Sequence, residues 1–129
     1  MIPWDFGIIN AFKNKLSCPI YPSEPEEKTP PYIVLRFDKY HDQNIFAINA
    51  DFSIQIVDID RWNNDRFKIA KEIVKIIFNR LELYQDDTYI GYAQTKVNKL
   101  ENNDHDIILK LTATIYLSTM YRDDEVDDE

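Results

Sequence analysis

Cysteine and glycine are scarce in this sequence, and their scarcity excludes several kinds of site. Among 129 residues there is one cysteine, Cys18, and there are two glycines, Gly7 and Gly91. A single cysteine excludes an internal disulfide framework, which fits a reducing compartment. Two isolated glycines exclude a glycine-rich phosphate-binding loop, and the Gly-x-Ser-x-Gly nucleophile motif is also missing. The sequence therefore carries no signature of a P-loop protein or a serine hydrolase.

Histidine is also scarce, because His41 and His105 are the only two. Both fall in predicted polar turns, without partners at the spacing that a metal site or a general base requires. Asp58 and Asp60 could bring two carboxylates together and bind a cation, or they could simply end a strand and begin a helix. Cys18 is predicted at a helix C-terminus, the end that does not activate a thiol. We therefore expect no enzymatic activity, no cofactor, and no catalytic or metal-binding residue.

The 23 acidic side chains outnumber the 15 basic ones, and the net charge is −8. Residues 123–129 alone contain six acidic side chains and no basic one, so most of the excess negative charge lies there. A generic nucleic-acid-binding protein should show a basic stripe, and none is visible. A basic, apolar N-terminus and long apolar runs are missing too, so we expect a cytoplasmic protein without a signal peptide or membrane span. These features predict a single domain over 1–122 and an acidic, disordered tail over 123–129.

Two adjoining stretches organise the rest of the chain. Residues 46–57 alternate between apolar and polar side chains, which predicts a long strand with one buried and one solvated face. Residues 66–81 repeat apolar side chains at helical spacing, and a second helix is expected over 2–16. Both the strand and the helix that follows it must bury an apolar face, so that helix should pack across the sheet. The predicted shared core consists of Ile54, Ile56, Ala70, Ile73, Val74, Ile77, Leu109, Leu111 and Ile115.

Three more strands complete the predicted sheet. One is expected over 32–37 and leads through a polar turn at 38–44 into the long strand, and the others are expected over 89–100 and 107–121. Gly91 is expected to mark a bulge. The predicted fold is α+β, with a four-stranded, mostly antiparallel sheet, two helices packed on one face, and the order α-β-β-α-β-β.

Residues 19–31 form a proline-rich, acidic stretch that the core does not need. Five of the six prolines lie here, which predicts an extended loop with room for a short strand at 20–21. Such arms commonly clasp neighbouring subunits, as does the end of a long final strand. An open sheet edge also tends to pair with another chain, although Lys96, Lys99 and the prolines could instead blunt the edge of a monomer. The candidate interface residues are Tyr21, Pro22, Glu24, Pro25, Glu26, Glu27, Tyr116 and Tyr121.

The order of these patterns is similar to that of a known family. An N-terminal helix is followed by the proline-rich loop, which ends in the sequence PYIVL at 31–35, and then by the alternating residues 51–56. The helix over 66–81 and a long terminal strand over 108–121 complete the pattern. Over nearly its whole length the chain resembles the small tail-terminator, or tail-completion, proteins of tailed bacteriophages and prophages. The acidic residues 123–129 depart from that family's pattern.

The resemblance implies a structural protein without a substrate, located in the virion at the tail and neck and assembled in the host cytoplasm. Members of this family form homohexameric rings that cap the tail tube and join the tail to the head. The implied partners are further copies of the chain, the tail-tube protein and head-tail connector proteins. DNA would pass through the ring without specific binding, and no membrane is implied. Two other classes remain open: a small acidic interaction protein, such as a toxin-neutralising immunity protein, and an enzyme of unrecognised type.

Overall fold

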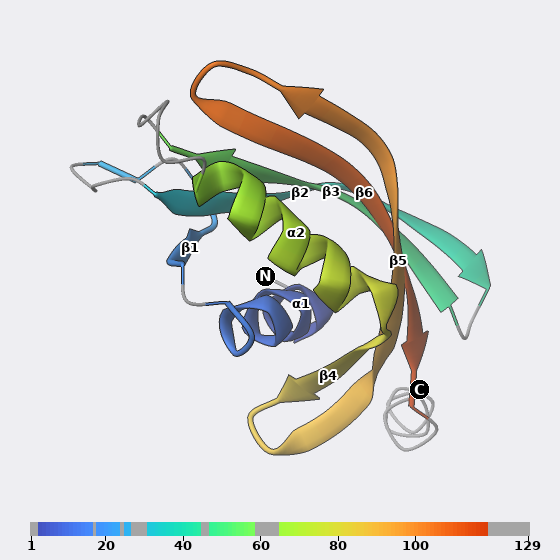
Figure 1. The fold of residues 1–129 in the computed structure, drawn as a ribbon. Coiled ribbons are helices and arrows are strands. Elements are labelled where there is room, and N and C mark those ends of the chain that lie inside the picture. Colours follow the sequence, from blue (N-terminus) through green and yellow to red (C-terminus); the bar gives the residue numbers. More distant parts are fainter. Residues whose placement is uncertain are drawn as a thin grey trace.

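The computed structural model describes residues 3–16, 18–23, 25–26, 31–44, 47–58 and 65–118, which contain two helices and six strands. The helices are α1 (Pro3–Lys13) and α2 (Asp65–Phe78). The strands are β1 (Ile20–Tyr21), β2 (Tyr32–Asn44), β3 (Ala47–Val57), β4 (Leu81–Gln85), β5 (Thr88–Asn102) and β6 (Asp106–Leu117). Figure 1 shows both helices lying inside the curve of the sheet.

All six strands join in one mixed sheet, so the predicted four-stranded sheet is wrong. The strand order is β1-β2-β3-β6-β5-β4, with β1 parallel to β2 and the other neighbouring pairs antiparallel. The sheet curves into a half-barrel around α2, and α1 packs against β4 (Figure 1). The described chain is therefore mostly sheet with two short helices, and the α-β-β-α-β-β arrangement does not describe it.

Strand β4 is one reason for the difference. The spacing of apolar residues predicts a helix over 66–81, but α2 ends at Phe78, and Leu81 and Leu83 are buried in β4 between more exposed neighbours. Leu81 lies four residues beyond Ile77, so its position satisfies helical periodicity as well as strand alternation. Local spacing does not separate the two, whereas the antiparallel pairing of β4 with β5 does.

Strand β2 is the other reason, together with the short strand β1 beside it. β2 continues through the predicted turn at 38–44, with irregular pairing between Phe37 and Lys39 and between Asp42 and Asn44. Polar residues on a strand need no burial to complete a hydrogen-bonded ladder with a neighbour. The hairpin of β2 and β3 is therefore longer than its apolar pattern alone indicates.

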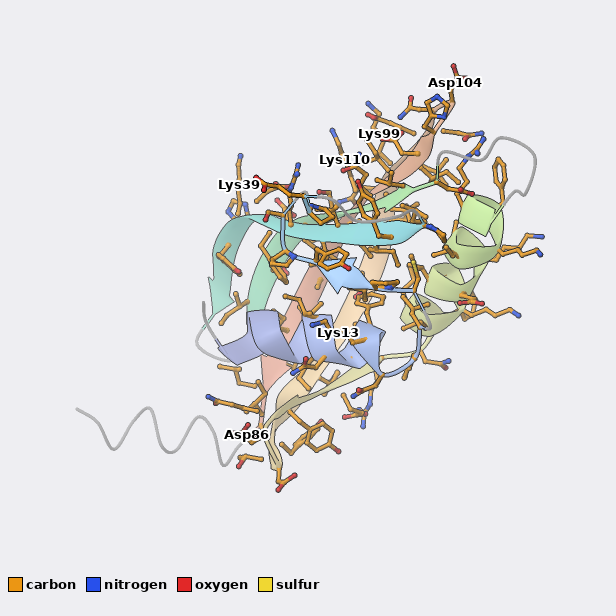
Figure 2. All side chains as sticks on the ribbon, turned by 90° about the vertical axis from the view of Figure 1, so that its left-hand side faces the viewer. Lys13, Lys39, Asp86, Lys99, Asp104 and Lys110 are labelled. Carbon is orange, nitrogen blue, oxygen red and sulfur yellow. The ribbon has the colours of Figure 1, made fainter. Side chains whose placement is uncertain are left out.

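The centre of the sheet, the antiparallel pair of β3 and β6, follows the predicted alternation. Ile54 lies opposite Leu109, and both side chains are buried. On the other face of the same strands, the Thr112 hydroxyl donates a hydrogen bond to the Asp51 carboxylate at 2.7 Å. Figure 2 shows charged side chains such as Lys110 projecting from this part of the sheet. One face builds the core, and the other carries polar side chains that hydrogen-bond across strands.

Helix α2 buries only part of its apolar surface. Seven of the nine predicted core residues are buried: Ile54, Ile56, Ile73, Ile77, Leu109, Leu111 and Ile115. Ala70 is partly buried. Val74 is 42% exposed, so its place in the predicted core is wrong. Val74 directly follows the fully buried Ile73, and because successive residues are rotated by about 100° around a helix, only one of the two faces the sheet.

Gly91 marks an irregularity in β5, as predicted, and it has no room for a side chain. The pairing of β4 with β5 shifts between Leu83, which lies opposite Gly91, and Tyr84. Gly91 has a φ of 146°, and a Cβ there would lie 2.1 Å from the carbonyl oxygen of Tyr116 on β6. Both the backbone conformation and the close approach of β5 to β6 therefore require glycine at this position.

Candidate interaction surface

The described residues considered for general-base or metal chemistry do not converge. His41 lies on β2 and not in a turn, with its Nε2 3.5 Å from the Asp51 carboxylate. His105 lies in the exposed turn between β5 and β6, where its carbonyl oxygen accepts a hydrogen bond from the backbone N–H of Asp58. Asp58 is buried, and Asp60, its predicted carboxylate partner, lies outside the described residues. No group of three or more metal-ligating side chains occurs within the described ranges.

The thiol of Cys18 is poorly suited to nucleophilic chemistry. The side chain is half-buried just after α1. Burial, together with the negative charges of Glu72 and Asp58, raises the pKa of the thiol to about 11. Because the thiolate is the reactive form, a thiol with that pKa is almost entirely unreactive at neutral pH.

Four of the predicted interface residues that precede β2 are described: Tyr21, Pro22, Pro25 and Glu26. We call residues 21–23 and 25–26 the arm. Tyr21 packs edge-to-face on Tyr32 with the ring centroids 6.0 Å apart, which ties the start of the arm to β2. Pro22 and Glu26 are exposed. The arm therefore starts from a fixed point and leaves both an apolar and an acidic side chain available to another molecule.

Tyr116 lies apart from the arm, on β6. Tyr116 stacks on Tyr92 with the ring centroids 5.1 Å apart, and the Arg80 guanidinium lies 4.4 Å from the centroid of the Tyr92 ring. Tyr116 is thus held in a cluster on the solvated side of β5 and β6. Pro25, within the arm, is half-buried. The remaining predicted residues, Glu24, Glu27 and Tyr121, lie outside the described part of the chain.

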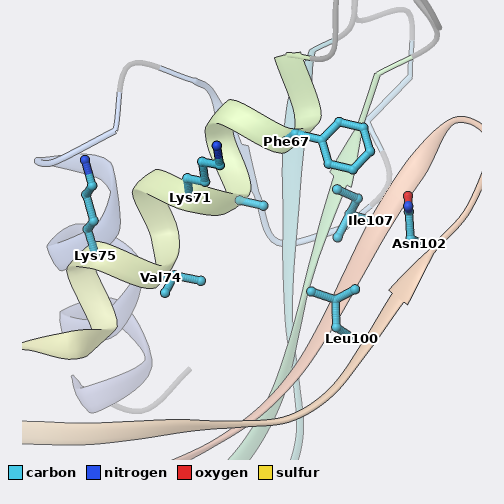
Figure 3. A pocket seen from close by; sticks show the side chains of 8 residues that line it. Phe67, Lys71, Val74, Lys75, Leu100, Asn102 and Ile107 are labelled. Carbon is cyan, nitrogen blue, oxygen red and sulfur yellow. The ribbon is translucent and has the colours of Figure 1, made fainter.

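An apolar surface that was not predicted lies between α2 and β5. Five large apolar side chains are exposed along it: Phe67, Val74, Phe78, Val97 and Leu100. They line two adjoining hollows of about 440 and 330 Å³, which share Val74. We call this surface the groove. Figure 3 shows its larger hollow, with Phe67 and Val74 on one wall and Leu100 and Ile107 on the other.

The groove exists because β5 extends beyond the elements that cover it. The first residues of β5 are flanked by β4, but residues 94–102 pair only with β6 among the described strands. Val97 lies opposite Leu111 and Leu100 lies opposite Leu109, so both point to the side of the sheet that carries the core. Helix α2 does not reach far enough to cover them, and Leu100 remains 55% exposed.

One wall of the groove is basic. Lys71 and Lys75 line the larger hollow from α2, which also exposes Lys68. Figure 3 shows the side chains of Lys71 and Lys75 projecting from α2. No acidic side chain is among the described residues that line either hollow. An apolar floor beside a row of cations favours a partner that combines apolar and acidic groups.

Two stretches of strand have open edges, one near each border of the sheet. β1 covers β2 only at Ile33 and Val34, which leaves residues 35–44 with β3 as their one described partner strand. On the other side, residues 94–102 of β5 have only β6. Open edges pair readily with other chains. Irregular pairing in both stretches limits how freely they can add further strands.

Part of the groove has a signal in the sequence of α2. Phe67, Val74 and Phe78 recur at spacings of seven and four residues, beside the buried stripe that contains Ile73. An apolar arc that is wider than the surface facing it leaves a helix with a second, exposed stripe. The signal in β5 is weaker, because a shift in its pairing interrupts the alternation.

No protein-family model matches the sequence, and no curated protein matches it significantly. Within the described part of the chain, neither helix has the length and apolar content to cross a lipid bilayer. The functional argument therefore depends on the groove, the arm and the open edges.

Proposed function

We propose that this chain is a structural protein of a phage or prophage virion, a tail terminator that forms a ring at the neck. The ring caps the tail tube and joins it to the head. The observation that carries the proposal is the pair of open edges on opposite sides of one sheet, next to an exposed apolar groove. Because the two sides differ, copies would associate through a heterologous contact, which closes a ring when the rotation between copies permits it.

The resemblance to tail terminators rests on the order of elements along the chain. The corrected fold keeps the N-terminal helix, the helix α2 and the long terminal strand β6 of that order and adds the strands β1 and β4. β1 and β4 are short strands at the two borders of the sheet. Each covers only part of its neighbour, so each leaves one of the two partial edges that such a contact would use. The proposed ring is a hexamer, as the resemblance implies.

The partners in this proposal are further copies of the chain, the tail-tube protein and head-tail connector proteins. DNA passes through the ring without specific binding, and the protein resides in the virion after assembly in the host cytoplasm. The separation of His41 from His105 in the fold and the raised pKa of Cys18 favour a structural role over an enzymatic one. The basic wall of the groove is also the opposite of what an immunity protein needs to bind a basic toxin.

Electron microscopy of the negatively stained, full-length protein tests the proposal, both alone and with tubes assembled from a phage tail-tube protein. We expect rings in solution or caps at the ends of the tubes. A chain that stays monomeric at high concentration and leaves the tubes unbound would rule the proposal out. A tight one-to-one complex with a basic protein, formed at a rate that falls steeply with salt, would favour an immunity protein instead.

A further inference from the structure

We infer that the groove of one copy binds the arm of the next copy in the ring. This inference rests on the proposed function, because it assigns two surfaces to the contact that closes the ring. In the groove the contact involves Val74, Leu100 and Lys75, and in the arm it involves Pro22 and Glu26.

The groove leaves large apolar side chains in water although it adjoins the core. Phe78 is 89% exposed at one end, whereas Ile107, on the wall of the larger hollow, is buried. Contiguous apolar surface rimmed by polar residues marks an interaction site more often than a chance exposure. A second chain laid along the groove would continue the existing core across Val74 and Leu100.

The arm has the chemistry that the groove would bind. Its two prolines, Pro22 and Pro25, supply apolar surface and have a fixed φ, so docking costs less conformational entropy than it would for a glycine-rich segment. Proline-rich segments are often bound in grooves lined by aromatic side chains, and Phe67 and Phe78 provide two such rings. Glu26 is exposed and supplies the negative charge that Lys71 and Lys75 would attract.

The arm and the groove lie at opposite borders of the sheet. This arrangement favours a contact between two copies. The arm leaves β1, which is four strand positions from β5 in the sheet, with α2 between them (Figure 1). The arm starts at the border of the sheet remote from β5, where a neighbour seated against β1 could offer its groove.

The acidic residues 119–129 are another segment of this chain that could enter the groove. They contain no proline, so ordering them would cost more backbone entropy than docking the arm. They follow β6, which ends at Leu117 opposite Gly91, at the end of β5 remote from Leu100. The arm is therefore the better occupant, and the acidic segment is one outcome of the test.

Two full-length variants test the contact under conditions in which the wild type forms rings. The groove variant carries Val74→Asp and Leu100→Asp, and the arm variant carries Pro22→Gly and Glu26→Lys. Each alone should lose the ring, with the dissociation constant of the contact raised by about 30-fold or more, as for loss of a hot spot. Mixed together, they should form a heterodimer, because one intact arm still meets one intact groove. Light scattering after gel filtration measures the mass.

Two further variants separate the contact from general damage. Tyr84→Asp is the matched control, because Tyr84 is an exposed apolar residue of β4 outside the groove, and its rings should stay intact. Lys75→Glu changes one exposed charge and should weaken the contact by about three- to tenfold, less at high salt. Adding Glu26→Lys to Lys75→Glu should recover most of the lost affinity between copies, because the two charges are exchanged. Damage to the fold of the single variant would not be repaired in this way.

The outcomes distinguish this inference from the proposed function. If both the groove and the arm variants form rings as stable as those of the wild type, the contact is refuted while the ring stands. Loss of rings on truncation after Ser118, with the arm variant unaffected, would assign the groove to residues 119–129 and overturn the inference. A wild type that forms no ring, either alone or on tail tubes, would remove the proposed function and this inference with it.

Discussion

The centre of the sheet and its β5 flank are built from the same kinds of side chain, yet only the centre is closed. In the centre, Ile54 and Leu109 face each other from β3 and β6 and are buried. In the flank, which comprises residues 94–102 of β5 and the exposed stripe of α2, Val97 and Leu100 point to the same side but stay exposed. The centre and the flank are equally apolar, but only the centre is covered by other elements of the chain. An apolar pattern sets the direction of a side chain, whereas its burial depends on elements elsewhere in the chain or in another copy.

The largest expected effect comes from two neighbouring residues of α2. Ile73→Ala should lower the free energy of unfolding by about 4 kcal/mol, because Ile73 is fully buried and the change leaves a cavity. Val74→Ala should cost less than about 1 kcal/mol in the monomer, because much of that side chain is already in water. Urea denaturation of both variants measures the difference. Equal losses would mean that the flank is as closed as the centre.

Gly91→Ala tests the close approach of β5 to β6 within the part of β5 that is also paired with β4. The substitution should cost about 3 kcal/mol, because the new Cβ would strike the Tyr116 carbonyl oxygen and because the backbone has a positive φ. Gly7→Ala is the control, since Gly7 is helical and its Cβ would lie 3.1 Å from Leu83, so helix propensity and crowding should nearly offset each other. A harmless Gly91→Ala would mean that β5 does not approach β6 this closely.

A smaller, pH-dependent effect is expected at the covered end of β5. Tyr89 donates a hydrogen bond to the Glu82 carboxylate at 2.7 Å, and burial together with Glu82 raises the pKa of its phenol to about 12, above the usual value near 10. The neutral phenol is therefore favoured in the folded state. The contribution of the Tyr89 phenol to the free energy of unfolding is fully present below pH 10 and is lost as the pH rises toward 12. Tyr89→Phe should remove that part of the decline in denaturation curves between pH 9 and 12, and an unchanged decline would contradict the contact.

The smallest expected change in stability is at the exposed end of α2. Phe78→Ser should alter the free energy of unfolding by less than about 0.5 kcal/mol, because the ring is almost fully exposed. It should also reduce binding of a fluorescent apolar dye by the monomer, since Phe78 lines the groove. A loss of stability above about 1 kcal/mol would show that the ring packs against the monomer in solution.

The sequence predicted the centre of the fold better than its borders. The strands over 47–57 and 106–117 follow from alternation, because from Ala50 onward in β3 and throughout β6 every second residue is buried. Leu81 satisfied two periodicities at once, so the start of β4 required knowledge of its partner strand. The groove was not predicted because Ile73 and Val74 are equally apolar, and only the reach of the sheet decides which is covered. The arm was predicted as an exposed segment from its prolines, whereas the surface it would bind was not.

Hydrogen exchange measured by mass spectrometry at several protein concentrations tests most directly whether the flank is an interface between copies. At concentrations that form rings, the backbone amides of residues 94–102 and 67–78 should exchange more slowly than in the dilute monomer. Amides in the centre, such as those of residues 107–113, should exchange at the same rate at every concentration, because β6 is already paired on both sides. A flank whose exchange does not change with concentration, while rings are present, would contradict the account.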